Sequence, residues 1–428
     1  MNRTPTVSFV CSPAAAQPSR GGPLPIPQRK RKRQQQESKR EEAAPSFPPW
    51  RQRLEEQEHA LRQEVEQFLE VLKVVGTPMI EEHAVHFIYY SPEARHVSLS
   101  GEFTQWNPPG LAITPLGRTG IFYHTLEFYE ATRAEYKFIV DGQWAVDPLC
   151  PNLVDNGIGE QNSFFVVGDV QEPPELQNVP TIPHGRVEEF DVKSKLLRNQ
   201  RRVYVYLPVG YDTDAQTRFP TLYVHDGGEY LTRAHLPTVL DNLIHSHEIS
   251  PLIAVMVDPV DRLREYQVNE SYARFVEKEL IPYVDGRYRT RVQREARGVM
   301  GASLGGLIAT YLALSRPHLF SKVGGQSSAL FLEQEKIMAL AKKLTASIAF
   351  YFDVGQYEPR FLPAHQQLVP LLQSTGASCV FQELVGGHNW TNWRAHLKDL
   401  LTCLWKGSEE STGGAPEIKP VRSRRRKQ

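Results

Sequence analysis

The chain has 428 residues, 40% of them hydrophobic, and its 49 basic and 49 acidic side chains leave a formal net charge of zero. Because a single hydrophobic core seldom grows beyond roughly 250 to 300 residues, this length predicts two folded domains. The balanced charge argues against a nucleic-acid partner, and no apolar stretch approaches the roughly eighteen residues of a membrane-spanning helix, so we expect no membrane partner either.

Residues 1–48 are rich in Pro, Gln, Ser and basic residues, and residues 407–428 end in a second basic run. Segments with so little apolar surface cannot offset the entropy cost of ordering, so we predict that both are disordered tails. Residues 49–76 instead place apolar side chains at helical spacing, which predicts a helix that packs on a neighbouring domain or binds a partner. These apolar positions are Leu54, Leu61, Val65, Phe68, Leu69 and Leu72.

Residues 77–170 show a different pattern, in which apolar and polar side chains alternate with a period of two. The alternating segments are 85–90, 97–100, 123–128 and 135–140, separated by turn residues such as those at 107–110. This pattern is typical of a small all-β, immunoglobulin-like sandwich. We expect a linker at 171–182 to follow it.

Three segments of this sandwich, 100–107, 136–148 and 157–163, resemble the early-set modules that bind glycogen and starch, called family 48 carbohydrate-binding modules. The resemblance implies an α-glucan partner, with tryptophan faces covering sugar rings while a lysine and an asparagine bond the hydroxyls. The matching positions are Trp106, Lys137, Trp144 and Asn162. The sequence departs from the module pattern at Glu160, where glycogen binders carry a threonine, so we favour a cleft-forming or docking role over glucan binding.

Residues 183–406 carry the most informative motif of the chain. An apolar run ends in Gly301-Ala302-Ser303-Leu304-Gly305, and the apolar stretch 307–314 follows at once. A strand that ends in G-x-S-x-G and turns directly into a helix is the nucleophile elbow of an α/β-hydrolase, which exposes the serine hydroxyl. The sequence therefore predicts that Ser303 is a nucleophile.

A nucleophilic serine needs a base and an acid that orients the base, and in α/β-hydrolases these follow the serine in the order acid, then histidine. His388 follows a predicted strand at 379–384 and lies in a loop, so we assign it as the base, whereas His396 reads as a surface or packing residue. For the acid we prefer Glu358, in the loop after the predicted strand 347–354, to Asp353 inside that strand. A loop carboxylate can reach across to the imidazole, and a strand residue is committed to one face.

An oxyanion hole also requires two backbone amides, one from the residue after the nucleophile and one from a loop after an earlier strand. Leu304 supplies the first. The segment 226–229 follows the apolar strand 221–225, and its glycines allow the backbone to approach a substrate closely. Gly228 is the preferred second donor, and its neighbour Glu229 is the alternative.

Several further segments in this region, among them 225–230, 258–272 and 279–284, make residues 183–406 resemble the enterochelin esterases of the esterase D branch. The resemblance implies an α/β-hydrolase fold and hydrolysis of carboxylic esters by a serine, histidine and acidic triad, without metal or organic cofactor. It also implies a small-molecule ester substrate such as an anionic ferric catecholate siderophore. Arg262 or Arg264 would suit such a ligand, although an arginine paired with Glu265 or Glu270 would serve to hold the loop.

The sequence thus predicts a serine carboxylic-ester hydrolase with an amino-terminal sandwich. Two alternatives stay open: a feruloyl or acetyl esterase acting on polysaccharide, and a glycan-binding scaffold whose hydrolase domain is inactive. The four cysteines, Cys11, Cys150, Cys379 and Cys403, lack the paired spacing of a zinc site or disulfide framework, and the first residues lack a convincing signal peptide. We therefore expect a reduced, cytoplasmic setting.

Overall fold

The computed structural model describes residues 49–157 and 159–406, so the two predicted tails lie outside the described residues. Of the described residues, 61–157 and 159–406 belong to one compact unit. The first described helix, α1 (Pro49–Val75), matches the predicted helix to within one residue. In its second half Val65 and Leu72 are buried against Ile88 and Ile121 of the sandwich, which explains the helical spacing of these apolar residues.

The sandwich consists of two antiparallel sheets. One has the order β1-β2-β6-β5 and the other β4-β3-β7-β10-β9, with β8 paired to β7. The strands are β1 (Met79–Glu81), β2 (Ala84–Tyr90), β3 (Val97–Gly101), β4 (Leu111–Ala112), β5 (Thr114–Pro115), β6 (Ile121–Glu127), β7 (Thr132–Val140), β8 (Gln143–Ala145), β9 (Leu153–Asp155) and β10 (Gln161–Val167). Buried aromatic rings fill the space between the sheets, among them Phe87, Tyr136 and Phe165.

The hydrolase domain contains an eight-stranded sheet of order β11-β12-β14-β13-β15-β16-β17-β18. Its first two strands pair antiparallel, β12 also pairs antiparallel with β14, and the remaining pairs are parallel. The strands are β11 (Arg186–Ser194), β12 (Asn199–Leu207), β13 (Thr221–His225), β14 (Ile253–Val257), β15 (Arg297–Ala302), β16 (Lys322–Gln326), β17 (Ala349–Gly355) and β18 (Ser378–Leu384).

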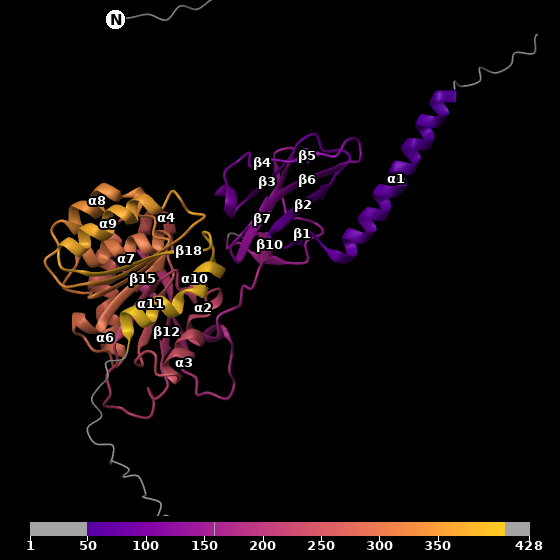
Figure 1. Cartoon of the computed structure of the whole chain (residues 1–428). Helices are drawn as coiled ribbons and strands as arrows, with labels where there is room; N and C mark the ends of the chain where they lie inside the picture. The colour runs from indigo at the N-terminus through magenta and orange to yellow at the C-terminus, as the bar shows by residue number, and fades with distance from the viewer. Residues whose placement is uncertain (1–48, 158, 407–428) are drawn as a thin grey trace, which may run out of the picture. The chain divides into compact units, whose positions relative to one another are not determined.

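Helices cover both faces of this sheet, as Figure 1 shows for α7, α8 and α9 on one side and α3 and α11 on the other. Successive strand residues point to opposite faces, so Val255 packs in one core and Met256 in the other. The helices are α2 (Gly227–Thr232), α3 (Leu236–His245), α4 (Arg262–Tyr266), α5 (Glu270–Phe275), α6 (Ile281–Arg287), α7 (Leu304–Ser315), α8 (Gln334–Ala341), α9 (Leu362–Ser374), α10 (Trp390–Ala395) and α11 (Leu397–Trp405).

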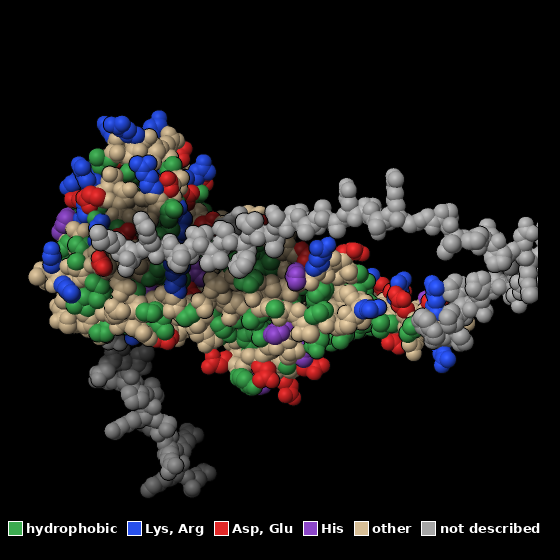
Figure 2. All heavy atoms as spheres, turned by 90° about the horizontal axis from the view of Figure 1, so that it is seen from above, with side chains coloured by type: hydrophobic (Ala, Val, Ile, Leu, Met, Phe, Trp, Pro, Cys, Tyr) green, Lys and Arg blue, Asp and Glu red, His purple; other side chains and the backbone are tan. Residues whose placement is uncertain are grey.

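The segment between the two domains, residues 171–182, is bound to the hydrolase domain. Its carbonyls at Glu175 and Gln177 accept hydrogen bonds from the Asn242 side chain on α3, at 2.8 and 2.9 Å. Within the described residues, no helix is long and apolar enough to cross a membrane. Figure 2 shows basic and acidic side chains interspersed on the face that it draws.

Candidate active site

Ser303 lies at the sharp turn between β15 and α7. Its backbone angles, φ 57° and ψ −119°, are rare for a residue with a side chain, and such strain persists only where the surroundings hold it. Two hydrogen bonds do so here, from the Ser303 amide to the Gln326 carbonyl at 2.8 Å and from the Ala329 amide to the Ser303 carbonyl at 2.9 Å. A Cβ at Gly301 would lie 2.5 Å from the Gly305 backbone, which is why this turn needs glycine.

The structure brings the three predicted triad residues together. The Nε2 atom of His388 lies 2.9 Å from the Ser303 hydroxyl, and its Nδ1 atom lies 2.5 Å from Oε1 of Glu358. Their loops follow β15, β17 and β18, whose carboxyl ends meet at one edge of the parallel part of the sheet. This chain of contacts has the geometry in which a histidine removes a serine proton while a carboxylate orients the ring.

The Glu358 carboxylate is buried and held by groups that sequence reasoning missed. Its Oε2 atom accepts hydrogen bonds from the Ser327 hydroxyl and the Gly355 amide, both at 2.7 Å, and Trp393 Nε1 donates to the same hydroxyl at 2.9 Å. Ser327 directly follows β16, the strand between those that lead to Ser303 and Glu358. That position is the one sequence signal that could have identified it.

Asp353, the alternative acid, has a different environment. It is 1% exposed within β17, its Oδ2 atom accepts a hydrogen bond from Gln326 Nε2 at 3.4 Å, and burial raises its pKa to about 8. His388 packs against the rings of Phe361 and Trp393, with centroids 4.7 and 4.9 Å away. The imidazole is thus fixed between two aromatic rings and the Glu358 carboxylate.

The two predicted oxyanion donors have unequal positions. Leu304 is the first residue of α7, so its amide has no partner within the helix and is available to a bound group. The amide of Gly228, the preferred second donor, instead donates to the Asp258 carboxylate at 2.6 Å in this structure, which favours the alternative, Glu229. The reason is that the loop after β14 places this carboxylate over the first turn of α2. Glu229 is in the same turn and lines the same cavity as Ser303.

The two arginines proposed for an anionic ligand are also placed differently from expectation. Arg262 lines the cavity but binds Asp226 through two hydrogen bonds of 2.8 and 2.9 Å, so its partner is neither Glu265 nor Glu270. Arg264, two residues further along α4, is exposed and does not line that cavity. A helix turns by about 100° per residue, which carries the second side chain away from the first.

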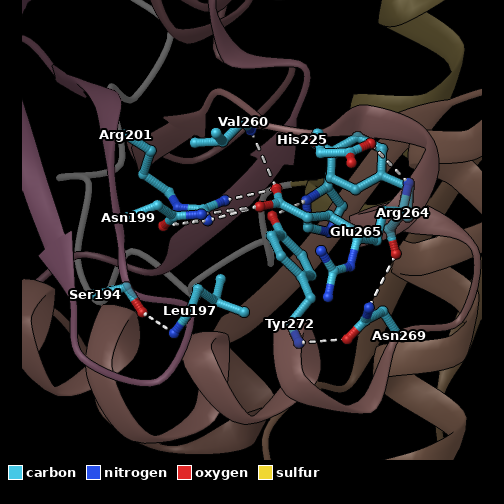
Figure 3. A network of polar contacts seen from close by, with 12 residues as sticks. Ser194, Leu197, Asn199, Arg201, His225, Val260, Arg264, Glu265, Asn269 and Tyr272 are labelled. Carbon is cyan, nitrogen blue, oxygen red and sulfur yellow. Dashed lines mark hydrogen bonds and ion pairs between the residues drawn. The ribbon is translucent and has the colours of Figure 1, made fainter.

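A buried ion pair lies behind this loop, and Figure 3 shows it at close range. Arg201 on β12 donates to both oxygens of Glu265 at 2.9 Å, and the Val260 amide donates to the same carboxylate at 3.2 Å. The Arg201 side chain is fully buried, and that of Glu265 is 6% exposed. This network anchors the segment that carries Asp258 and Arg262.

The sandwich residues singled out for glycan binding line the same cavity as Ser303 and His388. This cavity has a volume of about 840 Å³ and is lined by Trp106, Lys137, Trp144 and Asn162 as well. The two tryptophan rings have centroids 6.2 Å apart, with planes at 41°. Lys137 Nζ lies 2.5 Å from Glu160, the residue that departs from the module pattern, and Asn162 donates to Glu135 at 2.9 Å. This shared cavity agrees with the cleft-forming role that the sequence analysis favoured for the sandwich.

Contacts between the domains reach the loop of His388. Asn389 donates to the Glu102 carboxylate of the sandwich, and a Cβ at Gly387 would meet that carboxylate. On another side Arg233 pairs with Asp155 at 2.9 Å. The sandwich residue Glu102 therefore lies against the residues on both sides of His388.

Replacing Glu102 with Gln should change how stability depends on pH. Burial and repulsion from Glu135 raise the pKa of Glu102 from 4.5 to about 8. Below pH 4.5 both folded and unfolded states carry the proton. Between the two values the unfolded chain alone loses it, so the free energy of unfolding falls as pH rises, by up to ~1.4 kcal/mol per pH unit. Urea unfolding near pH 5 and near pH 8 should show a smaller decline in Glu102→Gln than in the wild type.

The exposed Glu130→Gln variant serves as the control, because it removes a carboxylate from the sandwich surface. It should retain the full decline of the wild type. Equal slopes for Glu102→Gln and the wild type would contradict a raised pKa at Glu102.

Comparison with known proteins agrees with this two-domain organisation. Residues 194–403 match the family model described as "Putative esterase", and residues 84–172 match the model described as "Glycogen recognition site of AMP-activated protein kinase". An enterobactin esterase from Shigella flexneri, solved in the presence of enterobactin, covers 76% of this chain with 94% of its own, at a TM-score of 0.63 and 22% identity. That structural match establishes the fold.

Several of the sequence relatives are named as esterases. The "Iron(III) enterobactin esterase" of Escherichia coli O6:H1 (strain CFT073) is 26% identical over 279 residues, which are 62% of this chain and 68% of that protein. Its counterpart in strain K12 is 27% identical over 242 residues, and the match spans 53% of this chain and 59% of that relative. An "Endo-1,4-beta-xylanase/feruloyl esterase" of Xylanibacter ruminicola is 26% identical over 239 residues, 53% of this chain and 32% of that protein.

The fold and the elbow at Ser303 define the class of the protein as an α/β-hydrolase. More narrowly, residues 194–403 match an esterase family model and resemble the enterochelin esterases, and residues 84–172 resemble a glycogen-recognition module, which supports a carboxylic ester hydrolase. Both resemblances predicted from sequence motifs are thereby confirmed. Among the described residues no cluster of three or more metal-binding side chains occurs.

Proposed function

We propose that this protein hydrolyses carboxylic esters through a covalent acyl-enzyme on Ser303. The observation that carries the proposal is the continuous contact from the Ser303 hydroxyl through His388 to Glu358, at 2.9 and 2.5 Å. The strained backbone of Ser303, at φ 57°, gives it further support. An inactive scaffold would have no need of this arrangement.

In the proposed mechanism the Ser303 oxygen attacks the ester carbonyl carbon as its proton passes to Nε2 of His388. Glu358 accepts a hydrogen bond from Nδ1–H of His388 and stabilises the imidazolium that forms. The histidine then gives the proton to the departing alcohol, leaving the acyl group on Ser303. Water enters by the same route and releases the acid, which restores the enzyme.

The negative oxygen of each intermediate requires two amide donors. We assign the first to Leu304. Since the Gly228 amide is bound to Asp258, we assign the second to Glu229, whose amide lies in the unpaired first turn of α2.

Two substrate classes have support. The names of the Escherichia coli relatives favour esters of an iron(III) catecholate siderophore. The alternative is an acyl ester of a polysaccharide, such as a feruloyl or acetyl ester. This alternative is favoured by the bifunctional xylanase relative and by the position of Trp106 and Trp144 on the wall of the cavity that contains Ser303. Because these two tryptophans line the cavity, we propose two roles for the sandwich, which are to form part of the cleft and to bind an α-glucan.

Rapid mixing of the full chain with an excess of 4-nitrophenyl acetate tests the mechanism. We expect a burst of nitrophenol close to one equivalent of enzyme, followed by slower turnover, because acylation releases the alcohol before deacylation. A fluorophosphonate should label Ser303, as peptide mass spectrometry would show, and the label should be absent from Ser303→Ala. Ser315, a serine at the end of α7, serves as the matched control: Ser315→Ala should retain both burst and label. Turnover that persists in Ser303→Ala would overturn the proposal.

A further inference from the structure

The cavity that contains Ser303 is larger than the ester bond requires, and its far wall belongs to the other domain. Its volume of about 840 Å³ lies in the upper part of the range for small-molecule sites. Ser303 and His388 line one part, and β7, β8 and β10 of the sandwich contribute Lys137, Trp144 and Asn162 to the rest. A substrate whose acyl carbon is at Ser303 therefore extends towards the sandwich.

Two aromatic faces meet the substrate there. Trp106 and Trp144 both line the cavity, with ring centroids 6.2 Å apart, and the Trp144 side chain is 43% exposed. The faces of an exposed and a half-buried tryptophan offer apolar surface to the C–H face of a ring-shaped ligand. Beside these rings, the buried side chains of Lys137 and Asn162 add polar contacts.

Carboxyl side chains outnumber cationic side chains in the cavity lining. Among the described residues that line it, two side chains are cationic at neutral pH, Lys137 and Arg262, and both are held in ion pairs, with Glu160 at 2.5 Å and with Asp226 at 2.8 Å. Against these stand six carboxyl side chains. They are Glu135, Asp155, Glu160, Asp226, Glu229 and Asp258, of which Glu135 is paired with Arg133, and Asp155 and Glu229 with Arg233.

This balance discriminates between the two substrate classes. To bind a polyanionic metal catecholate, each of these cations, in the lining or just outside it, would have to leave an existing acidic partner. An uncharged ligand with many hydroxyl groups has no such conflict, because each hydroxyl both donates and accepts hydrogen bonds. The cavity lining offers carboxylates, an amide and an ammonium group around two aromatic rings. These groups can form hydrogen bonds with the hydroxyl groups of a sugar ring that packs on the aromatic rings.

We infer that the alcohol part of the substrate is an uncharged glycosyl group, with its acyl ester at Ser303. The sugar ring contacts the faces of Trp106 and Trp144 on one side and the neighbouring amide and carboxylate groups on the other. This inference rests on the proposed esterase function and names its substrate class. The sandwich then forms the leaving-group site of the enzyme, and the carboxylates select against anionic alcohols.

Two esters that differ by one charge test the inference. The probes are methyl glucoside and methyl glucuronoside, each carrying a feruloyl group on O2, so that a carboxylate replaces a CH₂OH group at the far side of the ring. We expect kcat/KM to be about tenfold or more higher for the neutral ester, and the ratio to shrink when salt screens the charges. A ferric catecholate trilactone should be a poorer substrate still. Equal rates, or preference for the anionic ester or the trilactone, would overturn the inference.

Variants locate the selection. Glu160→Gln removes the partner of Lys137 and should narrow the preference for the neutral ester. The double variant Trp106→Ala, Trp144→Ala should raise KM for the feruloyl glucoside by about tenfold or more, and by much less for 4-nitrophenyl acetate. Tyr123→Ala removes an exposed sandwich aromatic outside the cavity and serves as the control. A double variant with unchanged KM would also refute the inference.

Failure here is distinguishable from failure of the proposed function. Hydrolysis of 4-nitrophenyl acetate that depends on Ser303 would show that the catalytic residues work, whatever the preference among alcohols. Loss of the charge preference with intact aryl ester hydrolysis would refute the glycosyl assignment and leave the esterase mechanism standing.

Discussion

Glu358→Gln should lower kcat for an aryl ester by roughly 10⁴-fold while leaving the fold intact. The amide keeps the size of the carboxylate but cannot stabilise the imidazolium, and its NH₂ group can hold the imidazole in the wrong tautomer. The large effect follows from the short contact between Glu358 and Nδ1 of His388, 2.5 Å, and from the burial of the carboxylate, which excludes water as a substitute. Steady-state kinetics with 4-nitrophenyl acetate measures it, and circular dichroism checks the fold.

Asp353→Asn is the matched control, since it makes the same chemical change at the other candidate acid. We expect kcat to stay within about threefold of the wild type, because Asp353 contacts Gln326 and not the imidazole. If instead Asp353→Asn lost activity and Glu358→Gln retained it, the acid would be Asp353 and the assignment from loop position would be wrong.

Arg201→Ala should cost about 3 to 5 kcal/mol of stability, because it leaves the Glu265 carboxylate buried without its partner. The Arg201 guanidinium is also stacked over the Phe275 ring, 4.4 Å from its centroid, so the truncation removes packing as well as charge. Urea unfolding monitored by tryptophan fluorescence gives the free energy difference.

The neighbouring Arg202 provides a matched control on the same strand. It pairs with Glu189 at 2.7 Å, but both side chains are about half exposed, so Arg202→Ala should change stability by less than about 1 kcal/mol. Similar losses of unfolding free energy for Arg201→Ala and Arg202→Ala would show that the buried ion pair stabilises the protein no more than the exposed one. Activity lost in Arg201→Ala at temperatures where it is folded would indicate that the pair also positions the loop carrying Asp258.

Sequence reasoning went furthest where chemistry depends on local backbone geometry or on chain order. The elbow at Ser303 is local, since small residues before and after the serine permit the turn. The order of acid and histidine after the serine, with each in a loop beyond a strand, predicted which side chains could meet at the carboxyl edge of the sheet. The preference for Glu358 over Asp353 came from the same reasoning.

Predictions were weaker where a residue's role depends on partners far along the chain. Gly228 has the backbone freedom expected of an oxyanion donor, yet its amide donates a hydrogen bond to Asp258, thirty residues later. Arg262 has the positive charge that would bind an anionic ligand, yet its guanidinium donates to Asp226. Ser327 supports the acid through a hydroxyl that belongs to no motif.

The amino-acid sequence by itself predicted the two-domain organisation, the candidate reactive side chains and the aromatic pair of the sandwich, because periodicity and short motifs record local conformation. The tertiary structure alone decided that Trp106 and Trp144 face the cavity of Ser303 and that the lining cations are already paired. Those facts depend on how two separately folded domains pack together. Charge and shape at such an interface arise from residues with no fixed spacing in the chain, so no pattern in the sequence could reveal them.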